Sequence, residues 1–350
     1  MTVAHPTLDE LVDVDVSALD RGAAIHLLQQ LLTSAVRLEY STIAPYLTAM
    51  WSIADQSHPA AVSVRRVVQQ EMLHTSLAAN LLVAVGGSPP FASPTFQPAY
   101  PGHLPGGVLP DLVVDLRGLD DTALHQFVQI EQPDHVVRIG ADDVLEFTDE
   151  PSPARSIGEF YAFVRSVFHH VRDAHGLHRL DPARQLTGPL ARRVALDIDD
   201  ADRMIDLICH QGEGSGRDPE DSGEADLAHY YRFLMLRERR AIERVDGVWR
   251  LTAELEPPVV FPVAPVPSGG YRREDVPADV WRLLDRFDTA YTRALRQLTA
   301  AWSGGGQGDL ILAIETMFAL VDPARALMQT EIGDGPATYA PDFLLRTDEP

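Results

Sequence analysis

Lysine is absent from the 350-residue sequence, and cysteine occurs once, as Cys209. Without lysine the protein cannot form the Schiff bases on which one class of covalent enzymes depends. A single cysteine excludes an internal disulfide and a zinc site built from several cysteines, and it favours a reducing compartment. The chemistry of the chain is therefore left to carboxylates, histidines and hydroxyl groups.

Positive charge is also scarce, because 29 basic residues stand against 51 acidic ones and the formal net charge is −22. No run of basic residues occurs, which argues against nucleic acid or an anionic membrane as a partner. No apolar run is long enough to cross a bilayer, and the first residues are acidic where a secretory signal is basic. We therefore expect a cytoplasmic protein that acts on a small molecule.

Hydrophobic residues make up 45% of the chain, which allows a large core and excludes disorder throughout. Apolar periodicity, caps and glycine or proline stops predict helices over 23–53, 64–87, 120–133, 156–175, 199–216, 226–245, 279–302 and 308–330. A proline- and glycine-rich stretch predicts a long ordered loop over 86–118, and the segment 249–271 is expected to be extended. We expect a single mainly α domain over 1–350, with a core bundle over about 23–245 and a C-terminal extension that contains two helices over about 246–350.

Two ionisable residues three positions apart, Glu71 and His74, interrupt the apolar pattern of the helix expected over 64–87. At about 100° per residue they fall on the same side as Leu82, whereas Gln69 falls on the opposite side. A buried carboxylate and imidazole are costly unless they are paired or coordinated to a metal. The pattern therefore predicts a buried site on this helix.

The same angular test places two further glutamates in the core. Glu39 shares its side with Leu32, and Glu131 shares its side with Phe127. Together with Glu71 they make three core-facing glutamates on three helices. A di-metal helix bundle takes one Glu from each of two helices and a Glu-x-x-His pair from each of the other two. The sequence Glu-Met-Leu-His at 71–74 is one such pair.

The second Glu-His pair is less regular. In the segment "HQGEG", His210 precedes Glu213 by three positions, which is the reverse of the expected order. His229 begins the next helical stretch. The spacing leaves two assignments open, Glu213 with His229 or Glu213 with His210.

Several segments resemble the ferritin-like domain of the iminophenyl-pyruvate dimer synthase group, which is found in enzymes of violacein and chromopyrrolic acid biosynthesis and in stand-alone proteins. The matching segments, spread over about 38–271, are "LEYSTIAPYLTAMWSI", "QQEMLHTSLAANLLVAVGG", "FVQIEQP", "IGEFY", "HQGEG", "HYYRF" and "PVPSGGY". The resemblance implies a ferritin-like four-helix bundle with long proline- and glycine-rich loops and extra C-terminal helices. It implies as metal ligands Glu39, Glu71, His74, Glu131, Glu213 and His229. His210 stands where an acidic residue is common in the group.

A site with several carboxylates and two imidazoles favours iron, with two ions per chain expected and manganese as the second choice. The resemblance implies a di-iron oxidase, oxygenase or imine-coupling synthase of secondary metabolism that oxidises or couples a small amino-acid-derived or aromatic substrate. Two alternatives are a non-catalytic iron-binding or storage bundle and a metal-free scaffold. The sequence leaves the oligomeric state open between a monomer and a small homo-oligomer.

Other aromatic and histidine residues have plainer explanations. Aromatic residues at helical spacing, among them Tyr46, are expected in the core. The histidines of "FHHVRDAHGLH", such as His169 and His175, are expected at a polar helix end and not at a second metal site.

Overall fold

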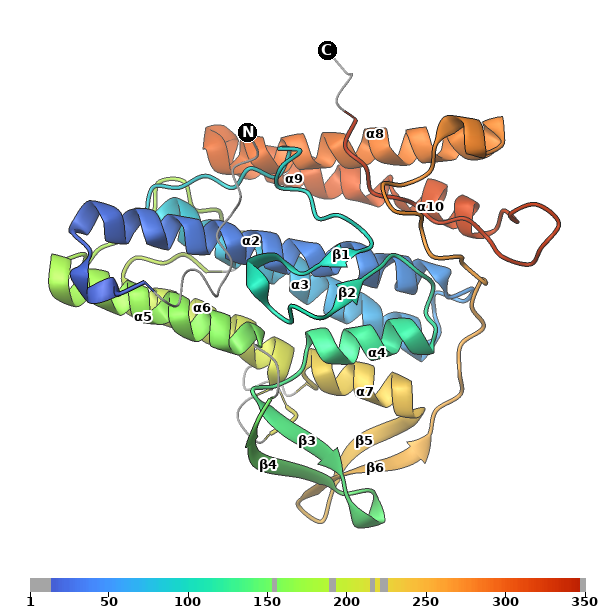
Figure 1. Ribbon diagram of the computed structural model, residues 1–350, viewed down its shortest axis with the longest axis horizontal. Helices are drawn as coiled ribbons and strands as arrows, with labels where there is room; N and C mark the ends of the chain where they lie inside the picture. The colour runs from blue at the N-terminus through green and yellow to red at the C-terminus, as the bar shows by residue number, and fades with distance from the viewer. Residues whose placement is uncertain (1–13, 153–155, 189–192, 215–217, 221–225, 347–350) are drawn as a thin grey trace.

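A computed structural model describes residues 14–152, 156–188, 193–214, 218–220 and 226–346. The first 13 residues, on which the expectation about a secretory signal depends, lie outside the described residues. Helices dominate, as expected, and Figure 1 shows them stacked in layers. The C-terminal helices cover one side of a central helix pair, and the remaining helices cover the other side.

The central pair consists of α2 (Arg21–Ser52) and α3 (Pro59–Ala84). The Asp20 carboxylate begins α2 by accepting the N–H of Ala23, and Pro59 occupies the first turn of α3, where its missing N–H is not needed. Both helices bury side chains around most of their circumference because other helices cover them from two sides. This double coverage gives each central helix two interior faces.

The layer on one side of the pair holds four shorter helices. They are α4 (Asp121–Ile130), α5 (Ile157–His175), α6 (Ile198–Glu213) and α7 (His229–Glu238). The Asp120 carboxylate caps α4 by accepting the N–H of Ala123. Glu131 is the C-terminal cap of α4 and stands two residues before Pro133, which cannot continue a helix. The proline thus fixes Glu131 at a helix end.

Two antiparallel hairpins extend from this layer, β3 (His135–Ile139) with β4 (Leu145–Pro151) and β5 (Arg240–Val245) with β6 (Val248–Glu254). The helix expected over 226–245 is therefore wrong beyond Glu238. Arg239 adopts a left-handed conformation with φ of 54°, which ends α7. Asp246 and Gly247 also have positive φ and form the two-residue turn of the second hairpin.

The proline- and glycine-rich segment over 86–118 is ordered, as expected. It contains the short strands β1 (Gly102–His103) and β2 (Val113–Val114) and the 3-10 turn η2 (Pro105–Gly107). Phe91 and Phe96 are fully buried, and Arg37 of α2 donates a hydrogen bond of 2.9 Å to the carbonyl of Phe96. The two buried phenylalanines and the hydrogen bond from Arg37 to the loop backbone thus hold the loop against α2. The remaining 3-10 turns are η1 (Val16–Ala18), η3 (Ala141–Asp143) and η4 (Arg273–Asp275).

The C-terminal layer contains α8 (Ala278–Ala300), the π turn η5 (Ala301–Gly305), α9 (Gly306–Phe318) and α10 (Val321–Met328). The single helix expected over 308–330 is therefore wrong, because the chain divides it into α9 and α10. In an unbroken helix the Pro323 ring would meet the carbonyl of Ala319. Starting a new helix at Val321 instead places Pro323 in a first turn, where proline is tolerated.

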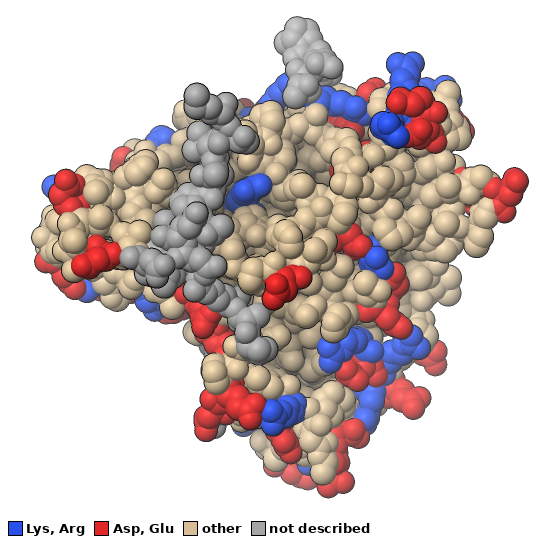
Figure 2. Space-filling view, viewed as in Figure 1, with Lys and Arg blue, Asp and Glu red and all other residues tan. Residues whose placement is uncertain are grey.

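No helix within the described ranges has both the length and the apolar character that a membrane span requires. Figure 2 shows acidic side chains interspersed with arginines on one face of the molecule, and many of them gather over the hairpins at the lower end. This face presents no continuous basic surface.

Candidate metal centre

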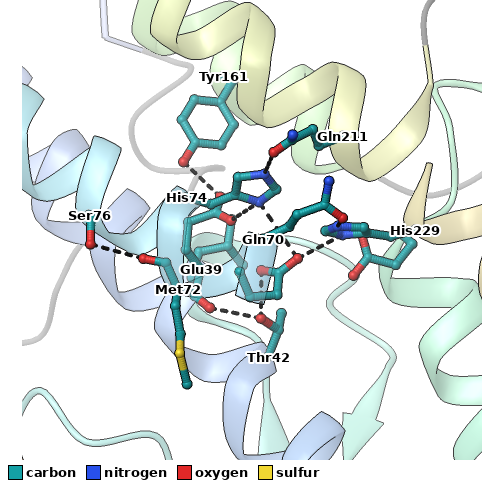
Figure 3. Close-up of polar contacts among 12 residues, drawn as sticks. Glu39, Thr42, Gln70, Met72, His74, Ser76, Tyr161, Gln211 and His229 are labelled. Carbon is teal, nitrogen blue, oxygen red and sulfur yellow. Dashed lines mark hydrogen bonds and ion pairs between the residues drawn. The ribbon is translucent and has the colours of Figure 1, made fainter. Parts of the chain in front are cut away.

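Five of the six predicted ligands converge between the central helix pair and the layer of α4–α7. They are Glu39 on α2, Glu71 and His74 on α3, Glu131 at the end of α4, and His229 at the start of α7. Figure 3 labels three of them, Glu39, His74 and His229. All five are buried, and none is more than 3% exposed. The periodicity of α2 and α3 places their three residues on the faces that point toward the other layer.

Glu71 lies at the centre of this cluster. Its Oε1 atom is 2.8 Å from Nδ1 of His229 and 3.6 Å from Nδ1 of His74. Its Oε2 atom accepts a hydrogen bond of 2.8 Å from the hydroxyl of Thr42. The two imidazole rings lie on either side, with centroids 5.4 Å apart. One carboxylate oxygen therefore faces both rings.

One half of the cluster pairs Glu39 with His74. Oε2 of Glu39 lies 3.5 Å from Nδ1 of His74, and Oε1 of Glu39 accepts a 2.7 Å hydrogen bond from the hydroxyl of Tyr161. The tyrosine hydroxyl leaves Oε2 directed toward the ring nitrogen.

The other half repeats this arrangement with different residues. Oε2 of Glu131 lies 3.5 Å from Nδ1 of His229, and Oε1 of Glu131 accepts a 2.5 Å hydrogen bond from the hydroxyl of Tyr46. Each half thus consists of one histidine, one glutamate and one tyrosine hydroxyl, with Glu71 between the halves.

Two glutamine amides hold the outer nitrogens of the rings. Oε1 of Gln211 is 2.9 Å from Nε2 of His74, and Oε1 of Gln70 is 3.2 Å from Nε2 of His229. Because an amide oxygen only accepts hydrogen bonds, each Nε2 carries the proton. In the neutral ring the lone pair is then on Nδ1, the atom that faces the carboxylates. Both rings are thus oriented to offer Nδ1 as a ligand atom.

The donor set fits a metal site. Glu71, His74 and His229 each offer one ligand atom, and these atoms lie within 4.8 Å of one another. Nδ1 of His229 is buried and makes no hydrogen bond of acceptable geometry in spite of its short distance to Glu71. A metal cation would supply the partner that this nitrogen lacks, and an unsatisfied buried polar atom is costly. Carboxylates with imidazoles are donors that suit iron and manganese.

The pKa values of the cluster residues also indicate that the site favours positive charge. Burial alone would lower the pKa of His74, but Glu39 and Glu71 raise it to about 10. Burial alone would raise the pKa of Glu71, but the neighbouring imidazoles of His229 and His74 hold it well below its usual range. Burial raises the pKa of Glu39, and the neighbouring charge of Glu71 adds to that rise. Buried carboxylates in this site are therefore stabilised by cationic partners.

Glu213, the sixth predicted ligand, is directed elsewhere. Its Oε1 atom accepts a 2.7 Å hydrogen bond from the N–H of Gly158, at the N-terminus of α5. A Cβ at position 158 would lie 2.9 Å from both Glu213 Oε2 and Asp134 Oδ2, so a larger residue there would displace these carboxylates. Burial and the neighbouring Asp134 raise the pKa of Glu213 well above its usual range. The structure thus places Glu213 beside the cluster but not with the five residues.

His210, the alternative partner of Glu213, also lies outside the cluster. It is half-buried on α6, and the next residue, Gln211, is the one that reaches His74. Adjacent residues on a helix point about 100° apart, so the two side chains cannot share one direction. The structure brings His229 and not His210 to the other ligands.

The residues that orient the ligands were not identified from the sequence as parts of the site. Tyr46 is in the core, as expected, yet its hydroxyl also reaches Glu131. A signal was present, because Tyr46 follows Glu39 by seven positions and Thr42 follows it by three, which places all three on one helix face. Gln70 and Gln211 gave no such signal, since each depends on a partner from another helix.

The second group of histidines remains separate from this centre. Nε2 of His169 lies 2.8 Å from Asp202, and Nε2 of His175 lies 3.0 Å from the carbonyl of Leu19. These contacts tie α5 to α6 and to the N-terminal segment. Within the described parts of the chain, the grouping of possible metal ligands is the one around Glu71.

Comparison with known proteins identifies the fold. A family model described as Ferritin-like matches residues 32–238, a range that contains every predicted ligand. The crystal structure of a ferritin-like protein from Caulobacter vibrioides is similar in fold, with a TM-score of 0.59 and 22% sequence identity over 86% of this chain and 94% of that chain. No curated protein matches the sequence. The fold expected from the sequence is thereby confirmed.

Proposed function

Because this chain belongs to the ferritin-like family, we propose that its buried cluster of carboxylates and histidines holds two metal ions, with iron as the first choice and manganese as the second. One observation carries the proposal. Oε1 of Glu71 lies close to Nδ1 of both His74 and His229, so one carboxylate serves both halves of the cluster. Each half of the cluster then adds a glutamate of its own.

The proposed roles follow from the contacts. Glu39 with His74 would hold one ion, Glu131 with His229 would hold the other, and Glu71 would contact both. The hydrogen-bond partners of these ligands fix ring orientation and carboxylate direction, a contribution that is commonly worth 10–100-fold in metal affinity.

A pair of such ions supplies redox or Lewis-acid chemistry when bound. The chain shields the site from solvent. Its ligands are buried, and other protein groups form hydrogen bonds with the outer atoms of both histidines and of Glu39 and Glu131. Water is thus kept from the ligands, and the faces of the ligands that remain available point toward one another.

For the reaction, we propose an oxidase, an oxygenase or an imine-coupling synthase of secondary metabolism. Its substrate would be a small amino-acid-derived or aromatic molecule. The support for this narrower assignment is the resemblance of segments such as "QQEMLH" and "HQGEG" to the iminophenyl-pyruvate dimer synthase group. We further propose that the protein works in the cytoplasm as a monomer or small homo-oligomer.

One feature favours the alternative of iron binding without turnover. Glu213 points to Gly158, so the centre has five of the six ligands of the expected pattern. A bundle of this kind could hold iron without the full ligand set of an enzyme.

Metal counting tests the centre first. After anaerobic loading with ferrous iron, the full-length protein is expected to hold about two ions per chain. His74→Ala and His229→Ala are each expected to lower the count, whereas His169→Ala, which removes a histidine outside the centre, should leave it unchanged. A protein that binds no iron would overturn the proposal and favour the metal-free scaffold.

Turnover and assembly separate the enzyme from the storage protein. The iron-loaded protein is expected to consume dioxygen or to form a coupled product when it is mixed with aromatic imines derived from amino acids. Size-exclusion chromatography is expected to show a monomer or small oligomer. A large hollow assembly without turnover would support storage instead.

A further inference from the structure

A cavity of about 460 Å³ lies between the central helix pair and the C-terminal helices. Met72 and Thr75 line it from α3, Leu295 lines it from α8, and Ile314 and Met317 line it from α9. Cavities that hold small organic ligands have volumes of roughly 300–1,000 Å³, so this one is of sufficient size. Its lining is largely apolar.

The cavity is distinct from the metal centre. Met72 and Thr75 each follow a metal-centre residue, Glu71 and His74, by one position, and one step along a helix turns the side chain by about 100°. In Figure 1, α8 and α9 lie on the opposite side of the α2–α3 pair from α4–α7, which complete the metal centre. The walls given by α8 and α9 also fall outside the residues 32–238 that the family model matches.

Tyrosine hydroxyls in the cavity wall already have partners. The hydroxyls of Tyr40 and Tyr291 are hydrogen-bonded to each other, and the hydroxyl of Tyr100 donates to the carbonyl of Ser41 at 2.5 Å. A ligand inside the cavity therefore meets aliphatic and aromatic surface more than free polar groups. This favours an apolar body for the ligand.

The opening of the cavity carries a positive charge. The lining residues that reach solvent include Gln69 of α3 and Phe318 of α9, which is 74% exposed, so the cavity opens between these helices. Arg65, one turn before Gln69, is half-buried and donates through Nη2 to the backbone carbonyl of Gln56 at 2.8 Å. Among the described residues no carboxylate forms an ion pair with Arg65. An anionic ligand group would supply that partner, and such charge-assisted hydrogen bonds are strong.

We propose that this cavity is a second binding site, which takes an amphiphilic monocarboxylate of the fatty-acid type. The apolar chain fills the space between α3, α8 and α9, and the carboxylate pairs with Arg65 at the opening. The site is independent of the metal centre, because its walls and its charged residue do not include any of the metal ligands.

Calorimetric titration of the full-length protein with decanoate, with and without iron, tests this proposal. Decanoate is expected to bind one molecule per chain with a negative heat-capacity change, and 1-decanol, which has the same chain without the charge, should bind about tenfold more weakly. Arg65→Gln should weaken decanoate binding by about tenfold and leave 1-decanol binding unchanged. Equal affinity for the two probes, or no saturable binding of decanoate, would overturn the proposal.

Arg66→Gln is the matched control, because Arg66 is the neighbouring arginine and pairs with Asp226 instead. It should change neither affinity, and an equal loss in both arginine variants would show a general charge effect and overturn the assignment to Arg65. Ala294→Phe fills the cavity from α8 and should weaken both probes at least about tenfold, whereas Ala278→Phe, at an exposed position of the same helix, should not. If circular dichroism shows that Ala294→Phe does not fold, the arginine pair decides. Iron content should stay unchanged in Arg65→Gln. This measurement separates a failure of the cavity proposal from a failure of the metal-centre proposal.

Discussion

Nδ1 of His229 lies 2.8 Å from Oε1 of Glu71. The contact joins the first residue of α7 to the middle of α3, two helices that are far apart in the chain. Both side chains are buried, so each depends on the other or on a cation for its stability. The precise placement of α7 against α3 therefore decides whether the two halves of the centre share a carboxylate.

Replacement of that shared carboxylate gives the first prediction. Glu71→Gln keeps the shape of the side chain and its contact with Thr42 but removes the negative charge. Because Glu71 faces both histidines, we expect iron affinity to fall by about tenfold or more at both positions together. Glu315→Gln, at an exposed position of α9, serves as control. Retention of both ions in Glu71→Gln, measured by elemental analysis, would contradict a bridging role.

The two glutamines that hold the histidines should act separately. Gln211→Leu removes the acceptor at Nε2 of His74, and Gln70→Leu removes the acceptor at Nε2 of His229. Each variant should weaken iron binding by about 10–100-fold at one position and leave the other nearly unchanged. Gln69→Leu, at the exposed neighbouring position, is the control. Anaerobic titration that resolves two binding steps would check this, and equal loss of both steps in either variant would speak against two separate halves.

Asn80 links three parts of the structure, and its loss should be costly. Its Nδ2 atom donates to the carbonyls of Leu186 and Arg193, and its Oδ1 atom accepts from the N–H of Leu186 and from Nε1 of Trp302. Asn80→Leu would leave these groups unpaired, including the buried Nε1 of Trp302, so we expect the free energy of unfolding to fall by about 3 kcal/mol or more. Urea denaturation measures this change. Ser166→Ala, which removes an exposed hydroxyl on α5, should have an effect within about 0.5 kcal/mol.

A buried carboxyl pair should make stability depend on pH. Burial and the neighbouring Asp342 raise the pKa of Asp288 to about 9, although Arg346 lies 2.9 Å away and opposes the rise. Between the unfolded value of about 4 and the folded value, the folded protein holds a proton that the unfolded chain has released. Stability from this residue is therefore present at low pH and is lost as the pH rises toward 9.

Asp288→Asn removes that dependence. The amide oxygen can still accept from the N–H of Leu344, as Oδ1 of Asp288 does. Between pH 6.5 and 8.5 the wild-type protein should lose about 1 kcal/mol per pH unit more than the variant. Urea denaturation at both pH values provides the comparison, and parallel pH profiles for the two proteins would show that Asp288 is not protonated in the native state.

The sequence predicted residues on regular helices well. Glu39, Glu71 and His74 lie within long helices whose 3.6-residue period fixes the direction of each side chain, so their convergence could be expected. Glu213 was harder, because it is the last residue of α6 and its direction depends on the N–H of Gly158 on another helix. Periodicity carries no information about such a contact.

The missed hairpin has a different cause. The segment over 226–245 is rich in Leu, Arg and Glu, which are good helix formers, and this local preference suggested a continuous helix. The pair Asp246–Gly247, which lies between the paired residues Val245 and Val248, was the competing signal for a two-residue turn. The tertiary contacts of β5 and β6 favour the turn, and helix propensity, which is a local property, carries no information about those contacts.

The helix α3 has one face against the metal centre and another face against the apolar cavity. A surface helix can vary freely on its solvent side, but this helix has little solvent side left between Val64 and Ala84. Substitutions there are constrained from both directions at once, by charge on one side and by volume on the other. A library that randomises α3 should therefore accept far fewer variants per position than one that randomises α9, whose outer residues Ile311 and Leu312 face water.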